Sequence, residues 1–117
     1  SRLKSATGGN QSVEQAILKE FLLSVPRMLI RCELAVDTAD GAGLEHWAHT
    51  LKGSSRTVGA EKLADLCQEL ERLGKQGQAD QGTSLLARLQ EAWELLSAHI
   101  QSLLETGMPE SEEKLAA

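Results

Sequence analysis

Hydrophobic residues recur every three or four positions along most of the chain, and this period is typical of amphipathic α-helices. The first such pattern covers about residues 12–39, with Ser12 as the N-cap and Gln15 completing a capping box. Pro26 lies inside this pattern and is expected to kink or split the helix, because proline cannot donate to the carbonyl four residues earlier. The hydrophobic positions are Val13, Ile17, Leu18, Phe21, Leu22, Val25, Met28, Leu29, Cys32, Ala35 and Val36.

Three shorter helical patterns follow, separated by glycine-rich breaks. The sequence DTADGAG ends the first pattern, and a second helix is expected over about residues 44–58, with Gly59 in the usual C-terminal glycine position. A third is expected over about residues 60–75, where GKQGQ stops it, and a fourth from about residue 79 or 83 to residue 105. Because the connections are short, neighbouring helices should be antiparallel. The predicted fold is therefore an all-α, up-down four-helix bundle.

The length of 117 residues fits one domain. The bundle is assigned to residues 12–106, between a disordered flank at 1–11 and a tail at 107–117 whose EEKLAA resembles vector-derived sequence. These ends suggest a piece excised from a longer protein. No apolar run approaches the ~20 residues of a membrane span, so we expect a cytoplasmic domain without direct membrane contact.

Composition and charge narrow the possible functions. The net charge of −5 gives no basic footprint for nucleic-acid binding. Cys32 and Cys67 both fall at apolar positions of helical patterns. We interpret them as reduced thiols in the core, because nothing in the sequence indicates a secreted disulfide scaffold.

A histidine lies opposite the apolar face of the second predicted helix. At about 100° per residue, Lys52 and Gly53 fall within about 60° of His49, together with Glu45 and Arg56. The core-facing residues of the same helix fall on the other side, and they are Leu44, Trp47, Leu51, Ser55 and Val58. His49 is therefore predicted to lie at the surface, in the middle of a polar row.

This polar row has the composition of a site that handles phosphoryl groups. An exposed neutral imidazole is a nucleophile, and cationic neighbours such as Lys52 and Arg56 disfavour its protonation and can stabilise phosphoryl charge. Gly53 costs the helix about 1 kcal/mol relative to alanine, so an offsetting use such as close approach of a partner is expected. Ser54 keeps the same region small. The alternative is an ordinary solvent-facing histidine beside ordinary surface cations.

The segment HTLKGSSRTVGA, followed by LADLCQELERLG, closely resembles the histidine-containing phosphotransfer (HPt) domain family of two-component phosphorelays. The resemblance is carried by His49, Leu51, Lys52, Gly53, Ser54, Ser55, Gly59, Ala60, Leu63, Leu70 and Glu71. It implies that His49 is the phosphoacceptor, modified on Nε2. It also implies that Lys52 lies near the phosphoryl group and that Gly53 leaves room for the partner.

Position 71 departs from a common pattern of the family, in which a residue that faces the histidine is glutamine in some members. A carboxylate only accepts hydrogen bonds and repels phosphate. Glu71 is therefore expected either to orient the unmodified imidazole through its Nδ1 proton or to point away. Gln68, one turn earlier, is a candidate substitute donor, and Leu18 or Leu22 on the first helix is a candidate docking contact. The other supporting or docking candidates are Glu45, Ser54 and Arg56.

The resemblance implies a bacterial phosphorelay intermediate. His49 would accept a phosphoryl group from a receiver-domain aspartate of a hybrid sensor histidine kinase and pass it to another receiver, such as that of a response regulator. No cofactor is expected in this domain, and Mg²⁺ is expected on the partner receiver. We expect a monomer without ATP-dependent kinase activity of its own, because the chain contains no nucleotide-binding motif.

Two alternatives remain open from the sequence. The first is a non-phosphorylated bundle that binds and inhibits a receiver or kinase. The unusual Glu71 is the feature that supports this alternative. The second is a kinase dimerisation hairpin, although there an acidic residue typically follows the histidine, whereas Thr50 follows His49 here. A metal site on His46 and His49 is disfavoured, because both cysteines are predicted on the buried side and no CxxC or HExxH pattern occurs.

Overall fold

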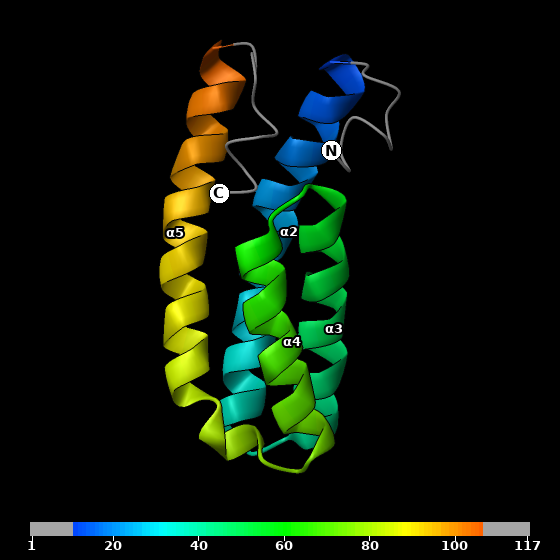
Figure 1. The fold of residues 1–117 in the computed structure, drawn as a ribbon, viewed down its shortest axis with the longest axis vertical. Helices are drawn as coiled ribbons and strands as arrows, with labels where there is room; N and C mark the ends of the chain where they lie inside the picture. The colour runs from blue at the N-terminus through cyan, green and yellow to red at the C-terminus, as the bar shows by residue number, and fades with distance from the viewer. Residues whose placement is uncertain (1–10, 107–117) are drawn as a thin grey trace.

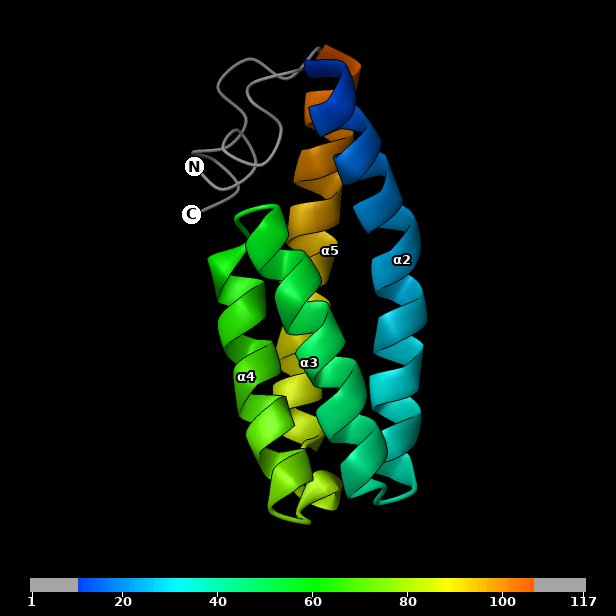
Figure 2. The ribbon, with the colours of Figure 1, turned by 90° about the vertical axis from the view of Figure 1, so that its right-hand side faces the viewer.

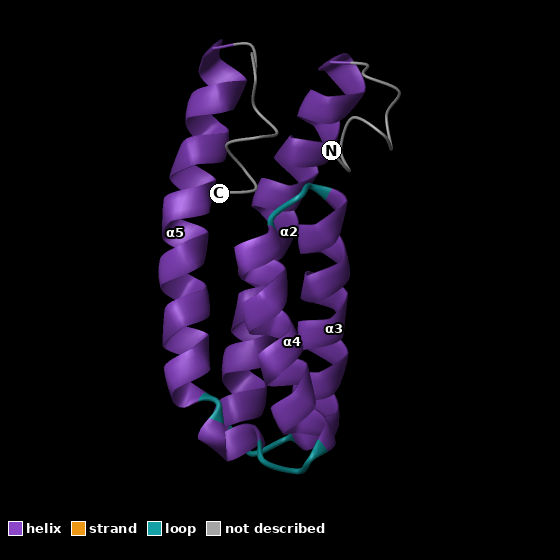
Figure 3. Cartoon of the chain, in the orientation of Figure 1, coloured by secondary structure: helices purple, strands orange, loops and turns teal. Residues whose placement is uncertain are grey.

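The computed structural model describes residues 11–106 and builds them almost entirely from helices (Figures 1 and 3). The elements are α2 (Gln11–Asp37), α3 (Gly41–Thr57), α4 (Glu61–Lys75), a short 3₁₀ turn η1 (Ala79–Gln81) and α5 (Thr83–Thr106). The predicted all-α four-helix bundle is confirmed. The predictions for residues 1–10 and 107–117 lie outside the described residues.

Each helix runs antiparallel to the next, in an up-down arrangement with short connections (Figure 1). The outer pair, α2 and α5, is longer than α3 and α4 and extends past the connection between them (Figure 2). Four helices of a single chain thereby enclose one hydrophobic core.

All four helices contribute to this core. The fully buried large side chains are Leu18, Val25, Cys32, Leu44, Leu51, Leu63, Cys67, Leu70, Leu89 and Ile100. Burial of each leucine contributes about 1.5–3 kcal/mol. Phe21 of α2 meets Trp93 of α5 edge to face, with ring centroids 5.4 Å apart.

The burial pattern corrects one prediction and confirms another. Leu18 is fully buried, so the suggestion that it forms a docking contact is wrong, whereas Leu22 is only partly buried and stays a candidate. Cys32 and Cys67 are buried and unbonded, as predicted for core thiols. Burial raises the pKa of Cys32 to about 12 and also raises that of Cys67.

The first helix differs from its prediction at its start, and of the two outcomes expected at Pro26 it excludes the split. Helix α2 is continuous through Pro26, which therefore does not split it. Pro26 is exposed, and a carbonyl freed on a solvent-facing side can bond to water. Ser12 is not the N-cap, because α2 already includes Gln11.

Helix α3 begins three residues before the predicted start. Asp40 is its N-cap, and the Asp40 carboxylate accepts a hydrogen bond from the backbone N–H of Gly43 at 2.9 Å. This cap holds the glycines of DTADGAG in the first helical turn. At the other end, Gly59 follows the cap residue Val58 with φ of +81°, which confirms its predicted role.

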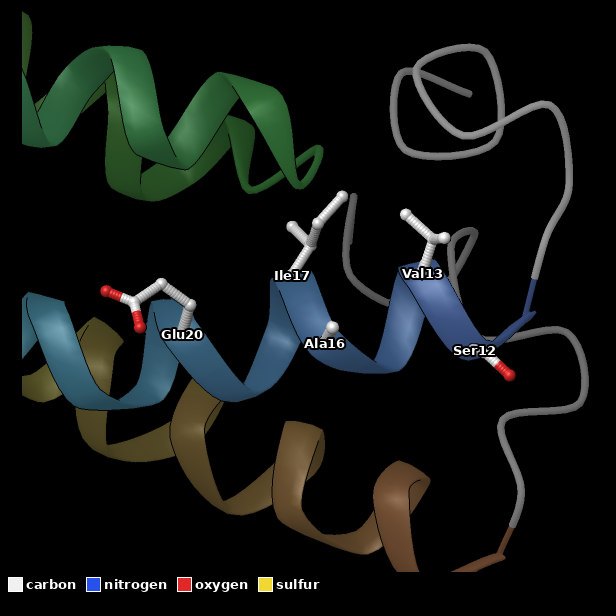
Figure 4. Close-up of a pocket in the computed structure, with 5 residues that line it drawn as sticks. All are labelled: Ser12, Val13, Ala16, Ile17 and Glu20. Carbon is white, nitrogen blue, oxygen red and sulfur yellow. The ribbon is translucent and has the colours of Figure 1, made fainter.

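The extension of α2 past the α3–α4 connection carries a mainly apolar hollow of about 420 Å³ (Figure 4). Val13 and Ile17 stand on the same side of the helix there, and Glu20 is the one titratable side chain in the lining. The lining does not include His49. Within residues 11–106, no helix is both long enough and apolar enough to cross a membrane.

Candidate functional site

His49 projects from the middle of α3, and its side chain is 68% exposed. The helix is held from the opposite side by Leu44, Ala48 and Leu51, which have no exposed surface. Burial of that side against the core fixes the rotation of the helix about its axis. The predicted exposure of the imidazole is confirmed.

Glu71 of α4 faces His49 and does not point away. Glu71 Oε2 lies 3.0 Å from His49 Nδ1, and Lys52 Nζ donates to Glu71 Oε1 at 2.5 Å. The Glu71 and Lys52 side chains are only 10% and 15% exposed, respectively. The carboxylate therefore bridges the histidine and the lysine, each of which binds a different oxygen.

The charge state of Glu71 determines which nitrogen of His49 is free. Burial acts to raise the pKa of this carboxyl, but the hydrogen bonds that it accepts from Lys52 and His49, together with the positive charge of Lys52, outweigh burial and lower it. An ionised carboxylate only accepts, so the proton in the 3.0 Å contact belongs to Nδ1. The lone pair of the neutral ring is then on Nε2, which forms no hydrogen bond within the described range.

Close packing of α3 against α4 brings these side chains within reach. A Cβ on Gly74 would lie 2.6 Å from the backbone nitrogen of Glu45 and 2.7 Å from the carbonyl oxygen of Gly41. Only glycine permits this backbone approach, which lies one turn from Glu71. In the sequence, Gly74 reads as part of a helix stop, whereas it lies inside α4, and the left-handed turn follows at Gly77, where φ is +69°.

Among residues 11–106, no backbone packs against Gly53 in the way that α3 packs against Gly74. It lies inside α3 with ordinary helical backbone, and a Cβ placed on it would meet nothing within 4 Å. Neither packing nor conformation therefore requires glycine here. The open space one turn beyond His49 is available to a molecule that approaches from outside.

The remaining predicted site residues divide between the two flanks of α3. Arg56 Nη2 donates to Gln68 Oε1 at 3.0 Å, so Gln68 is occupied by Arg56 and the contact to His49 comes from Glu71 instead. Ser54 lies on the flank of α3 that faces α2. Glu45 lies on the other flank, beside His49.

A hollow of about 400 Å³ on that second flank contains one charged residue that the sequence reasoning did not single out, Lys75. Lys75 and His46 line it together with Glu45, His49 and Glu71. The position of Lys75, four residues after Glu71, was a usable signal, because residues at this spacing share a helix face. In the part of the chain that the structure describes, no three His, Cys, Asp or Glu side chains are grouped to hold a metal ion.

Comparisons with known proteins agree with this fold. The crystal structure of histidine-containing phosphotransfer protein B (HptB) from Pseudomonas aeruginosa PAO1 is similar to this chain, with a TM-score of 0.83 and 24% sequence identity over 90% of this chain and 91% of that one. At this identity the similarity establishes the fold. A search of curated proteins gives no match. The sequence profile of the Hpt domain family matches residues 16–99, and the chain therefore belongs to the Hpt domain family.

Proposed function

We propose that this domain is a phosphorelay intermediate that accepts a phosphoryl group on Nε2 of His49 from a phospho-aspartate of one receiver domain and passes it to an aspartate of another. Membership of the Hpt family supports a phosphotransfer role. The observation that carries the proposal is the contact between His49 Nδ1 and Glu71, which leaves Nε2 as the free nucleophile on an exposed ring.

The transfer exchanges one bond for another. The Nε2 lone pair forms a bond to phosphorus, and the bond from phosphorus to the aspartate oxygen breaks, which returns the receiver's carboxylate. Because Nδ1 keeps its proton, the ring becomes positively charged as the N–P bond forms. The carboxylate of Glu71, hydrogen-bonded to Nδ1, stabilises that charge where it develops.

The same arrangement addresses the repulsion expected between a carboxylate and phosphate. Glu71 contacts the ring at Nδ1, whereas the phosphoryl group attaches at Nε2. Lys52 binds the other carboxylate oxygen and offsets its charge. The transfer is reversible, because the imidazole of a phosphohistidine that is protonated on Nδ1 leaves as a neutral ring when a second aspartate attacks the phosphorus and the N–P bond breaks.

The partner receiver is expected to bring its own acidic pocket and Mg²⁺. This domain contributes a rigidly held imidazole, local cations and the clearance at Gly53. A kinase dimerisation hairpin is disfavoured, because the described residues enclose a four-helix core within one chain.

Incubation with receivers carrying ³²P-labelled phospho-aspartate tests the proposal. The label should move to this chain, be acid-labile and alkali-stable, and be absent from His49→Gln. His46→Gln is the matched control, because His46 is an exposed histidine one turn away. Equal labelling of His49→Gln would overturn the assignment, and tight receiver binding without any transfer would favour the inhibitory bundle instead.

A further inference from the structure

A groove of about 500 Å³ runs between α2 and α3, on the flank of His49 opposite to Glu71. Its walls include Arg27, Met28 and Arg31 from α2 and Trp47, Thr50 and Ser54 from α3. Nothing in the transfer step proposed above uses these residues. The groove nevertheless lies beside the reacting imidazole.

The groove is continuous with the surface around His49. Thr50 and Ser54 directly follow His49 and Gly53 in the sequence, so the row that lines the groove is adjacent to the row that carries the imidazole. A partner that covers His49 and Gly53 therefore also lies next to the groove and can contact its lining residues.

The charge of the groove is opposite to that of the whole chain. The net charge is −5, yet Arg27 and Arg31 lie one turn apart on α2, both exposed. Neither guanidinium forms an ion pair with another residue of the range 11–106. Glu20 lines the far end of the groove and confines the positive charge to the half that contains the arginines.

Aromatic packing holds one of these arginines in place. The Arg31 guanidinium lies 5.7 Å from the centre of the Trp47 ring, and Trp47 in turn meets His46 edge to face at 4.8 Å. This stack presents a preordered cation above an apolar surface formed by the half-buried Trp47 and by the small exposed part of Met28, which is otherwise buried in the core.

We infer that the α2–α3 groove is a second contact for the receiver domain and takes an acidic segment of it, with carboxylates on Arg27 and Arg31 and an apolar side chain on Met28 and Trp47. The inference rests on the proposed phosphotransfer function, since the receiver is the body seated over His49. Arginine binds carboxylates through two parallel hydrogen bonds, which makes it selective for the position of the acid. The groove then sets which receivers dock, whereas His49 and Glu71 set the chemistry.

The test compares Arg27→Glu/Arg31→Glu with wild type in binding to the receiver that labels His49. Charge reversal should weaken binding about tenfold. The affinity of wild type should fall as salt is raised from 50 mM to 300 mM, and the affinity of the variant should change much less over the same range. Arg27→Lys/Arg31→Lys should recover part of the affinity. Arg88→Glu is the matched control, because Arg88 is an exposed arginine on α5 and should bind as wild type does.

A small phosphoryl donor separates the two proposals. Phosphoramidate needs no docking groove, so it should phosphorylate His49 equally in wild type and in the charge-reversed variant. Unchanged receiver affinity in the variant, with His49 still labelled, would overturn the groove assignment and leave the proposed function intact. Failure of wild type to accept a phosphoryl group from any receiver or from phosphoramidate would overturn both.

Discussion

His49 and Glu71 are 22 residues apart in the chain, yet the Nδ1 of one lies 3.0 Å from the Oε2 of the other. This contact joins α3 to α4 at the point where the imidazole leaves the bundle. It assigns the proton to one ring nitrogen and the lone pair to the other, and it puts a negative charge behind a ring that becomes positive in the proposed transfer. In that proposal, the chemistry of the site depends on a residue that does not touch the phosphoryl group.

Removal of the carboxylate should slow transfer without abolishing it. Glu71→Ala loses a charge-assisted hydrogen bond, and about 1.4 kcal/mol of lost transition-state stabilisation corresponds to about tenfold in rate. Glu71→Gln should slow transfer less than Glu71→Ala does. The glutamine amide oxygen can still accept a hydrogen bond from Nδ1–H, but the neutral amide cannot offset the positive charge of the ring. Single-turnover transfer from a phosphorylated receiver measures both variants.

Glu69→Ala is the control for this comparison. Glu69 lies on the same helix, but it is exposed and pairs with Arg72 at 3.3 Å. Its variant should transfer at the wild-type rate. If Glu71→Ala were as fast as Glu69→Ala, the carboxylate would have no part in the reaction.

Acid should weaken the contribution of Glu71 to stability. Its pKa is lowered below the ordinary value of 4.5 in the folded protein, because the hydrogen bonds from Lys52 and His49 outweigh the effect of burial. The unfolded chain therefore binds more protons at this group as the pH falls below 4.5, and the stabilisation present above that pH is lost. Urea unfolding of wild type and Glu71→Gln from pH 7 to pH 3 should show a difference in unfolding free energy that narrows below pH 4.5. A difference that widens on acidification would mean that the folded-state pKa is raised.

The sequence predicts the fold and the orientation of His49 because both depend on helical periodicity. The rows that include Leu44 and Leu51 face the core, so the imidazole opposite them must face water. The same reasoning could not choose between the two candidate partners Gln68 and Glu71, because one turn of α4 separates them and their reach depends on the distance and rotation between helices.

That interhelical distance follows from a glycine whose role is not visible in the sequence. Gly74 has the appearance of a helix stop within GKQGQ, and only the packed backbones of α3 and α4 reveal that it permits close approach. The start of α3 was placed too late for a related reason. DTADGAG looks like a loop until Asp40 is recognised as the cap that holds its glycines in a helical turn.

The two helix glycines should respond to alanine in opposite ways. Gly53→Ala should raise the unfolding free energy by about 1 kcal/mol, because alanine is the better helix former and its Cβ meets nothing. Gly74→Ala should lower it, because its Cβ would collide with the backbone of α3. Thermal unfolding measures both.

Transfer rates then separate stability from function. Gly53→Ala should accept the phosphoryl group from a receiver more slowly despite its greater stability, since the added methyl group lies where the partner approaches. Faster or unchanged transfer by this variant would show that the partner does not need the clearance at Gly53.

The two cysteines should react with a thiol reagent only when the protein unfolds. Burial raises the pKa of Cys32 to about 12 and raises that of Cys67 as well, so almost no reactive thiolate exists in the folded state. A thiol reagent should modify the native protein very slowly and both residues rapidly in denaturant. Rapid modification of native protein would indicate that the helices α2 and α4 open far more often than a packed core allows.

The protonation of the His49 ring tests the account most directly. Long-range ¹H–¹⁵N NMR of the ¹⁵N-histidine-labelled domain at neutral pH, before and after phosphorylation, distinguishes the two ring nitrogens. The predicted result is that the neutral form of the ring carries its proton on Nδ1 before reaction and that the phosphoryl group is on Nε2 afterwards. A proton on Nε2 in the unmodified ring, or a phosphoryl group on Nδ1, would contradict the role assigned to Glu71.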